Sequence, residues 1–153
     1  MTTRPEPGGW TLEAIRASRP GSMLEAIGFE PLEVGDGRCL AAMEVGPSVI
    51  QPRGLVHTGA FVTLADAAAT YAALTVTDPE ATWDLGRFPY AVQVSANVVR
   101  NTDRGRVTAD ARVVHRGRTM QVVETEVRDG QGRLLARVTT THVVVPRNGP
   151  AGE

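Results

Sequence analysis

Cysteine is almost absent from this chain of 153 residues, and lysine is missing altogether. The single Cys39 cannot form an intrachain disulfide, so we expect a protein of a reducing compartment such as the cytoplasm. We interpret Cys39 as a small buried hydrophobic residue, because nothing near it in the sequence would activate a thiolate. One cysteine and three scattered histidines also lack the spacing of a metal site, and we expect no metal.

The chain also has no large excess of positive or negative charge. The 16 basic residues, all arginine, nearly balance 17 acidic ones, for a net charge of −1 and an isoelectric point near 6.3. This balance argues against a nucleic-acid partner and against an anionic membrane surface. The lack of lysine is most simply a compositional bias, so the number of arginines carries little functional weight.

The sequence also shows no targeting signal. Its first ten residues, MTTRPEPGGW, contain neither an apolar signal core nor a cationic leader. No apolar run approaches the roughly 20 residues that a membrane span requires, so we expect a soluble cytoplasmic protein with no membrane partner. At this length, with 42% hydrophobic residues, one domain with a real core is expected.

Composition divides the chain into an extension, a domain and a tail. We expect residues 1–20 to form a partly disordered extension, residues 21–146 the domain, and residues 147–153 a disordered tail. Two short helices are predicted near the start, over Thr11–Ser18 and Ser22–Ile27. No repeat of 20 to 50 residues is visible.

Hydrophobic patterning predicts strands on both sides of one long helix. Phe29–Val34 and Arg38–Val45 read as two strands, and 58–74 reads as a helix that ends before Pro79. Four later runs are rich in β-forming residues, and the glycine-containing turns between them favour consecutive antiparallel hairpins. These runs are Tyr90–Arg100, Arg106–Arg116, Thr119–Arg128 and Leu134–Val145.

One of these runs shows how the layers should pack. Within Arg106–Arg116, apolar residues at 107, 109, 111 and 113 alternate with Thr108, Asp110 and Arg112, which indicates one covered face and one wetter face. We expect the apolar helix to cover the first face. The predicted class is therefore α+β, with a long central helix wrapped by a twisted antiparallel β-sheet.

A single charge interrupts the helix. The segment TGAFVTLADAAATYAALTV, residues 58–76, contains Asp66 as its only charged residue. An unpaired buried carboxylate is costly, so such a residue is either satisfied by a neighbouring arginine or helix end, or has a function. We take Asp66 as the leading candidate for a catalytic residue.

The residues before the helix complete a recognisable pattern. The spacing Gln51-x-x-Gly54-x-x-His57-Thr58-Gly59, followed by Leu64-x-Asp66, resembles the PaaI-like acyl-CoA thioesterases of the hotdog fold. Weaker support comes from Val94-x-x-Asn97, Arg116-Gly117-Arg118 and Gly132-Arg-Leu-Leu-Ala136.

The resemblance implies hydrolysis of a small or aromatic acyl-CoA to a carboxylic acid and coenzyme A, with no cofactor beyond the CoA of the substrate. It also implies a homodimer or homotetramer with the active site between subunits, where Gln51 faces Asp66 of the partner subunit. Gln51 would orient the water or bind the thioester, His57 would fix the loop, and Thr70 would hold the attacking water.

The chemistry of the residues agrees with this resemblance. Thioester hydrolysis needs a base or nucleophile, a donor for the oxyanion and a means of holding water. Asp66 is either a general base or a direct nucleophile, and the sequence leaves both open. Backbone N–H groups around Thr58 and Gly59, at the positive end of the helix dipole, are candidate oxyanion donors. Thr70 lies four residues after Asp66, on the same helix face.

Three positions depart from the family pattern. Thr58 stands where a glycine is usual, which places a side chain beside the expected oxyanion site. Gln51 stands where asparagine is more common. Gln93 occupies a place where some relatives have a catalytic serine, and we count it among the substrate-binding candidates.

Coenzyme A phosphates are expected to meet arginines near strand ends. The candidates are Arg100, Arg116 and Arg118, helped by the backbone N–H groups of Thr119 and Met120. The alternative is that these arginines are ordinary solvated charges. We assign no function to His115 or His142 and interpret them as surface or interface residues of alternating strands.

Two other functions remain open. One is a hotdog protein that binds acyl-CoA without catalysis. The other is a hotdog hydratase or dehydratase, in which a histidine and an acid act at a different offset from that between His57 and Asp66.

Overall fold

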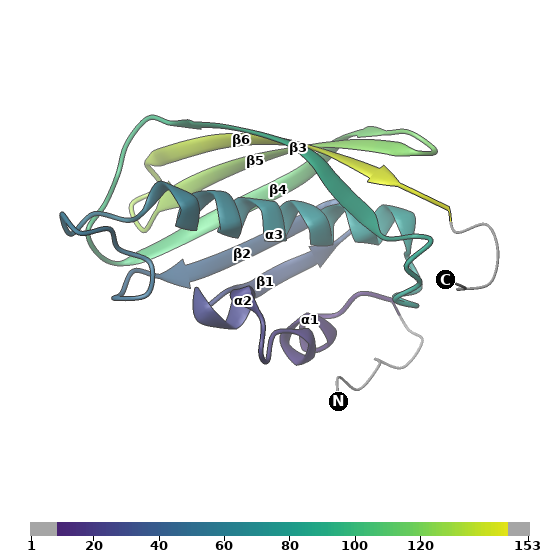
Figure 1. The fold of residues 1–153 in the computed structure, drawn as a ribbon, viewed down its shortest axis with the longest axis horizontal. Helices are drawn as coiled ribbons and strands as arrows, with labels where there is room; N and C mark the ends of the chain where they lie inside the picture. Colours follow the sequence, from purple (N-terminus) through teal and green to yellow (C-terminus); the bar gives the residue numbers. More distant parts are fainter. Residues whose placement is uncertain (1–8, 147–153) are drawn as a thin grey trace, which may run out of the picture.

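The computed structural model describes residues 9–146 and has one long helix packed on a six-stranded antiparallel sheet (Figure 1). The strand order is β1-β2-β4-β5-β6-β3. The predicted disordered tail, 147–153, and residues 1–8 of the predicted extension over 1–20 lie outside the described residues. The helices are α1 (Leu12–Ser18), α2 (Met23–Ala26) and α3 (Thr58–Thr77), and the strands are β1 (Glu30–Gly35), β2 (Arg38–Glu44), β3 (Pro89–Val98), β4 (Arg106–Arg116), β5 (Met120–Asp129) and β6 (Leu134–Val144).

The long helix α3 is the centre of the core. It crosses one face of the sheet (Figure 1) and contacts every strand. It ends at Thr77, three residues later than predicted but before Pro79 as expected, because proline disfavours the helical conformation in the residue before it, the capping Asp78. One prediction needs correction: α3 has 20 residues and a mean hydropathy of 1.3, enough by length and composition to span a membrane. Most of the helix is buried under the sheet, however, so it serves as a core helix.

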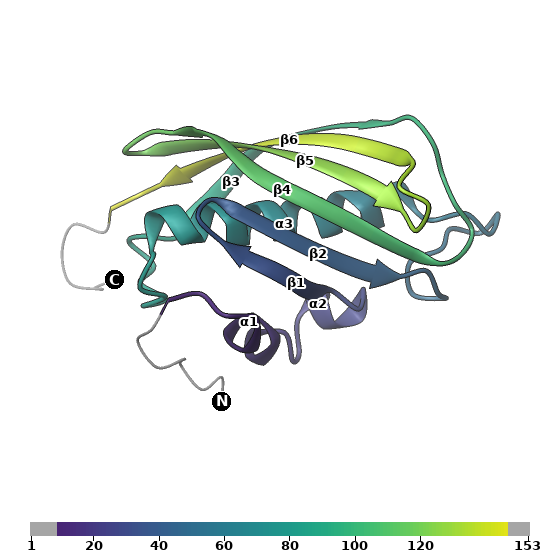
Figure 2. The ribbon, with the colours of Figure 1, turned by 180° about the vertical axis from the view of Figure 1, so that it is seen from behind.

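The predicted hairpins are confirmed for β4, β5 and β6 but wrong for β3. Strand β3 pairs with β6, and β2 takes the place beside β4 (Figure 2). The segment between β3 and β4 contacts the residues before α3: Asn101 Nδ2 donates to the Val56 carbonyl at 2.9 Å, and Val56 N–H donates to the Thr102 carbonyl at 3.0 Å. The chain therefore crosses the end of the sheet instead of turning back.

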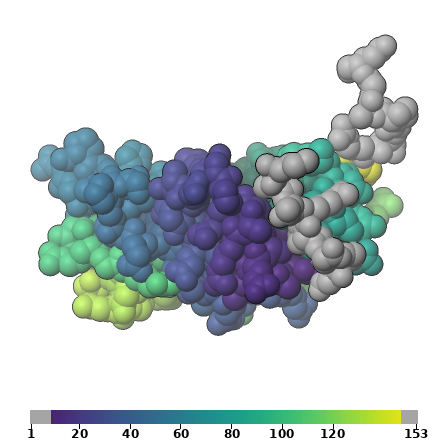
Figure 3. All heavy atoms as spheres, turned by 90° about the horizontal axis from the view of Figure 1, so that it is seen from below, coloured from purple at the N-terminus to yellow at the C-terminus, as the bar shows by residue number. Residues whose placement is uncertain are grey.

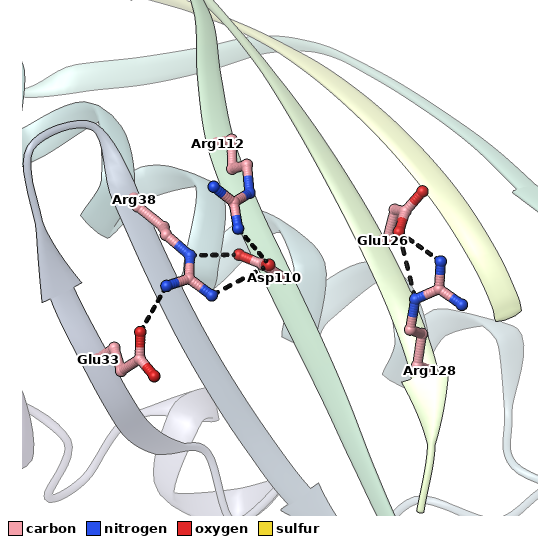
Figure 4. A network of polar contacts seen from close by, with 6 residues as sticks. All are labelled: Glu33, Arg38, Asp110, Arg112, Glu126 and Arg128. Atoms are coloured by element: carbon pink, nitrogen blue, oxygen red, sulfur yellow. Dashed lines mark hydrogen bonds and ion pairs between the residues drawn. The ribbon is translucent and has the colours of Figure 1, made fainter. Parts of the chain in front are cut away.

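The two faces of the sheet differ as predicted from the alternation in β4. Val107, Ala109 and Ala111 are fully buried under α3. The opposite face carries ion pairs, among them Arg38 with Asp110 at 2.8 Å (Figure 4). Burial alone would raise the pKa of Asp110, but hydrogen bonds from Arg38 and Arg112 lower it overall. This charged surface explains why apolar and polar residues alternate.

The loop between α3 and β3 is held to the N-terminal segment. In Figure 3 that segment, in purple, lies between the blue loop before α3 and the teal loop after it. Trp10 contacts Trp83 edge-on at 4.8 Å between ring centroids and Tyr71 at 5.8 Å. Trp83 and Phe88 both pack against the core and so anchor this loop.

Asp78 organises this loop from inside the fold. Its side chain is fully buried and accepts hydrogen bonds from the Thr82 hydroxyl at 2.8 Å and the Trp83 N–H at 2.9 Å. The Arg87 guanidinium lies 3.7 Å from the same carboxylate. A buried charge with these partners is satisfied, and its loss would leave two partly buried donors unpaired.

The edge strand β3 is unusual because both of its faces are exposed. After Pro89, all of its residues are exposed. They include large apolar side chains, such as Val92 at 62% and Val94 at 43% of full exposure. Its outer edge also presents unpaired backbone groups, which is typical of a strand that another chain covers.

We expect Asp78→Ala to lower the free energy of unfolding by about 1–3 kcal/mol, because the Thr82 hydroxyl and Trp83 N–H lose their acceptors. Urea titration followed by circular dichroism measures this loss. Glu80→Ala is the matched control, since that exposed acid lies 3.9 Å from the same Arg87 and should cost about 0–1 kcal/mol. Equal losses in the two variants would contradict the anchoring role of Asp78.

Candidate active site

His57 caps the start of α3. Its Nδ1 accepts a hydrogen bond from the Gly59 N–H at 2.8 Å, and its own N–H donates to the Val49 carbonyl at 2.8 Å. A side chain at position 59 would place its Cβ 3.0 Å from His57 Nδ1, so glycine is needed for the ring to lie there. The structure thus gives His57 a geometric reason to hold this loop.

The capping bond also distinguishes the two candidate oxyanion donors. The Gly59 N–H is already bound to His57. Among the described residues, the Thr58 N–H has no acceptor. It lies at the N-terminal end of a 20-residue helix, where the dipole favours negative charge. Thr58 is therefore the residue whose N–H is free to meet an oxyanion.

Asp66 lines a pocket of about 260 Å³ beside α3. The pocket is largely apolar, and other lining residues come from α2 (Met23 and Leu24) and from the loop after α3 (Trp83 and Phe88). The Asp66 Oδ1 atom is buried and has no hydrogen-bond partner among residues 9–146. Burial raises the pKa of Asp66, and the charge of His142 opposes that rise. An unpaired carboxylate in such surroundings is a strong base for its type.

His142 is the residue that the sequence analysis missed. It is fully buried, so our interpretation as a surface residue is wrong, whereas His115 is exposed as expected. The His142 Nδ1 lies 3.1 Å from the Pro89 carbonyl, and Nε2 lies 2.9 Å from the Thr140 hydroxyl. Because a carbonyl only accepts, we assign the proton to Nδ1.

The charge state of His142 follows from its burial. Burial lowers its pKa, while the Pro89 carbonyl and the charge of Asp66 oppose that decrease. The neutral ring is thus favoured near pH 7. The sequence signal was weak, because a histidine after three threonines reads as polar on either face of a strand.

Thr70 shares the pocket with Asp66, as its spacing predicted. The other pocket threonine, Thr63, donates its hydroxyl to the Gly59 carbonyl at 2.8 Å, and Thr75 donates to the Ala72 carbonyl at 2.7 Å. The Thr70 hydroxyl makes no such bond to the helix backbone within the described residues. It remains available to hold a water molecule beside the carboxylate.

Gln51 lies in a tight loop outside the pocket of Asp66. Its Oε1 accepts a hydrogen bond from the Arg53 N–H at 2.6 Å, and its N–H donates to the Leu55 carbonyl at 2.8 Å. Neither Gln51 nor His57 lines the pocket that contains Asp66. Within one protomer, Gln51 and His57 are therefore separated from Asp66.

The predicted CoA-binding residues also lie at two ends of the protomer. Arg100 donates to the Leu134 carbonyl at 3.3 Å, at the start of β6. Thr119 accepts from Val144 at the end of β6, so the group from Arg116 to Met120 is at the opposite end. Arg116 also pairs with Asp36, at 3.2 Å.

The remaining candidates are not drawn into this pocket. Gln93 is exposed on β3, next to a register shift in its pairing with β6, and Arg118, Thr119 and Met120 are exposed in the β4–β5 hairpin. Within residues 9–146, no group of three His, Cys, Asp or Glu side chains has the arrangement of a metal site. Cys39 is fully buried, as predicted, and burial raises the pKa of its thiol to about 12.

Comparison with known proteins identifies the family. A model described as the thioesterase superfamily matches residues 53–136. The chain is 33% identical over 132 residues to the 1,4-dihydroxy-2-naphthoyl-CoA hydrolase of Escherichia coli, covering 85% of this chain and 93% of that protein. It is 34% identical over 124 residues to the proofreading thioesterase EntH of Cronobacter turicensis, covering 80% and 85%.

Solved structures agree with this result. A mutant of the thioesterase PA1618 from Pseudomonas aeruginosa superposes with a TM-score of 0.78 at 30% identity, covering 90% of this chain and 96% of that one. The thioesterase HI1161 from Haemophilus influenzae gives 0.82 at 24% identity, covering 99% and 100%, which shows the shared fold.

The chain therefore belongs to the thioesterase superfamily, and the predicted hotdog fold is confirmed. It is a thioester hydrolase, as its relatives are thioesterases or CoA hydrolases. The PaaI-like assignment within the superfamily stays a prediction.

We expect Asp66→Asn to raise the melting temperature at pH 7. The pKa of Asp66 is raised from 3.8 in the folded state, so the stability linked to its proton is present below 3.8 and is lost as the pH rises through the raised value. Asparagine removes the cost of the buried charge, and the difference between the two proteins should shrink toward acid pH.

Thermal unfolding measured from pH 3 to pH 8 checks this expectation, with the exposed Glu13→Gln as the control. A wild-type protein that is more stable than Asp66→Asn at pH 7 would show that the carboxylate has a stabilising partner.

Proposed function

We propose that this hydrolase cleaves acyl-CoA thioesters and that Asp66 is its catalytic carboxylate. The observation that carries the proposal is the buried, unpartnered Oδ1 of Asp66 in an apolar pocket with the free hydroxyl of Thr70. Two relatives named above act on CoA esters or are thioesterases, which supports the choice of substrate.

In the general-base route, Thr70 holds a water molecule and Asp66 removes its proton as the oxygen attacks the thioester carbonyl. The N–H of Thr58 stabilises the oxyanion, a contribution of about 3–4 kcal/mol in comparable sites. The C–S bond then breaks, the electron pair leaves with sulfur, and the proton held by Asp66 neutralises the CoA thiolate.

In the nucleophilic route, Asp66 itself attacks the carbonyl and expels CoA, which leaves a mixed anhydride that water hydrolyses. Both routes need an ionised Asp66 and the same oxyanion donor. Hydrolysis in ¹⁸O-labelled water tests the second route: water that attacks the aspartyl carbonyl of the anhydride leaves label in the Asp66 carboxylate, which the general-base route never does.

The proposal includes a subunit interface. Gln51 and Thr58 of one protomer would act on the substrate beside Asp66 of the partner subunit. The exposed apolar face and open edge of β3 support such pairing between two copies. A dimer or tetramer would also join the two separated groups of CoA-binding arginines.

The hydratase or dehydratase and the non-catalytic binder are the other candidates. The Nδ1 of His57 accepts the hydrogen bond of the helix cap, which argues against His57 acting as the proton carrier. Incubation with acyl-CoA esters and a thiol reagent separates all three, since only a hydrolase releases free CoA.

We expect Asp66→Asn to lower kcat by about 10²–10⁴-fold without loss of structure, because the amide cannot accept the proton. For the wild-type protein, kcat/KM should rise with pH through the raised pKa of Asp66, with the midpoint of the acid limb above 3.8. Thiol release at several pH values checks both. Normal turnover by the variant would exclude Asp66 as the catalytic group.

Mixed subunits test the shared site. Gln51→Ala and Asp66→Asn should each be nearly inactive, but refolding them together forms heterodimers in which one of the two sites is intact. Random pairing then restores about a quarter of wild-type activity, given a two-fold interface. If Gln51 and Asp66 act within one chain, every site carries a defect and the mixture stays as inactive as its components.

A further inference from the structure

The pocket of Asp66 continues along α3 beyond the reacting groups. Asp66, Thr70 and Leu74 follow one another at four-residue spacing and all line it. With a rise of about 1.5 Å per residue, Leu74 lies about 12 Å along the helix from the carboxylate. The small Ala67 and the ring of Tyr71 complete this helical face, so the polar groups gather toward the Asp66 end.

Trp83 lies at the Leu74 end of this groove. Its backbone N–H donates to the Asp78 carboxylate at 2.9 Å, and Asp78 caps the C-terminus of α3. Its ring contacts Trp10, whose Nε1 donates to the Asp78 carbonyl at 2.7 Å. Because the Trp83 backbone is bonded to the residue that caps the helix and its ring packs on Trp10, which is bonded to the same residue, the indole lies at the far end from the carboxylate of Asp66.

Phe88 lines the groove nearer to Asp66. It precedes Pro89, whose carbonyl accepts from His142 Nδ1, and His142 and Asp66 each affect the pKa of the other, so these two side chains lie near one another. The ring of Phe88 also contacts Tyr90 edge-on at 4.9 Å. The loop thus runs beside the groove from Trp83 to Phe88. Two buried side chains hold its ends: Asp78 binds Trp83, and His142 binds Pro89, next to Phe88.

The backbone of this loop is fixed in an unusual conformation. Ala81 has φ 52° and Trp83 has φ 58°, a region that residues with side chains seldom adopt. Such backbone conformations persist where surrounding contacts hold the residue in place, and they are frequent in segments that bind ligands. The hydrogen bonds to Asp78 hold the backbone of Trp83 in this conformation, so Trp83 is a fixed boundary of the groove.

We propose that Trp83 determines which acyl groups this enzyme accepts. The acyl group lies along α3 from Asp66 toward Leu74, and the indole of Trp83 closes the far end. Compact aromatic and medium-chain acyl groups fit, and long straight chains are excluded. The inference rests on the proposed function, because it requires the thioester carbonyl to lie beside Asp66.

The test compares wild-type protein with Trp83→Ala over a series from butanoyl-CoA to palmitoyl-CoA, with benzoyl-CoA included. The wild-type kcat/KM should fall steeply beyond octanoyl-CoA. Trp83→Ala should raise the palmitoyl-to-octanoyl ratio about tenfold or more, since each methylene admitted to an apolar pocket contributes strongly to selectivity. Leu85→Ala is the matched control: it is 51% exposed in the same loop, lies outside the pocket, and should leave the ratio unchanged.

Two further measurements keep the outcome decisive. Trp83→Leu removes less volume and serves if Trp83→Ala does not fold, as judged by circular dichroism. Binding of non-hydrolysable thioether analogues of the same acyl-CoA series, measured by calorimetry, reports the length limit without turnover. If the wild type hydrolyses no acyl-CoA, the proposed function fails, and the dissociation constants still test Trp83.

An unchanged length profile in a folded Trp83 variant overturns the inference. A shift toward longer chains in both kcat/KM and affinity supports it.

Discussion

The close packing of α3 on the sheet is the constraint from which the site follows. Ala65, Ala68 and Ala72 are fully buried, and such small side chains let the helix lie near the strands. That face has no room for a charge. Asp66 therefore lies on the neighbouring face of the helix, half-buried, where a pocket replaces the sheet as its surroundings. Its missing partner, raised pKa and access to substrate all follow from this position.

Much of the fold was predictable because local pattern determines it. The apolar run of α3 and the alternation in β4 each reflect burial against a neighbour that the pattern itself implies. The position of β3 could not be predicted in this way. The segment after β3 contacts the residues before α3, where Asn101 binds Val56, 45 residues away in sequence. The burial of His142 was likewise hidden, because threonines around it suit either face of a strand. Asp66 could be found because a lone charge in an apolar helix is costly wherever the helix packs.

Within one protomer, the candidate site residues lie in separate places. On one side, His57 fixes the helix start and leaves the Thr58 N–H free; on the other, Asp66 and Thr70 share a pocket. Gln51 and the two arginine groups are too widely spread for one chain to gather them. The exposed faces of β3 and this division both fit the proposed pairing of two subunits. Spreading the site over two chains would make its assembly depend on protein concentration.

The absence of lysine and the burial of Cys39 have a chemical consequence for an enzyme that handles activated acyl groups. Thioesters acylate amines and thiolates without a catalyst, and most proteins offer them many lysines. Here no side-chain amine exists to be modified, and the one thiol is enclosed in the core with its pKa raised to about 12, so almost none of it is thiolate. The side chains of this protein are thus poor targets for self-acylation by its own substrate.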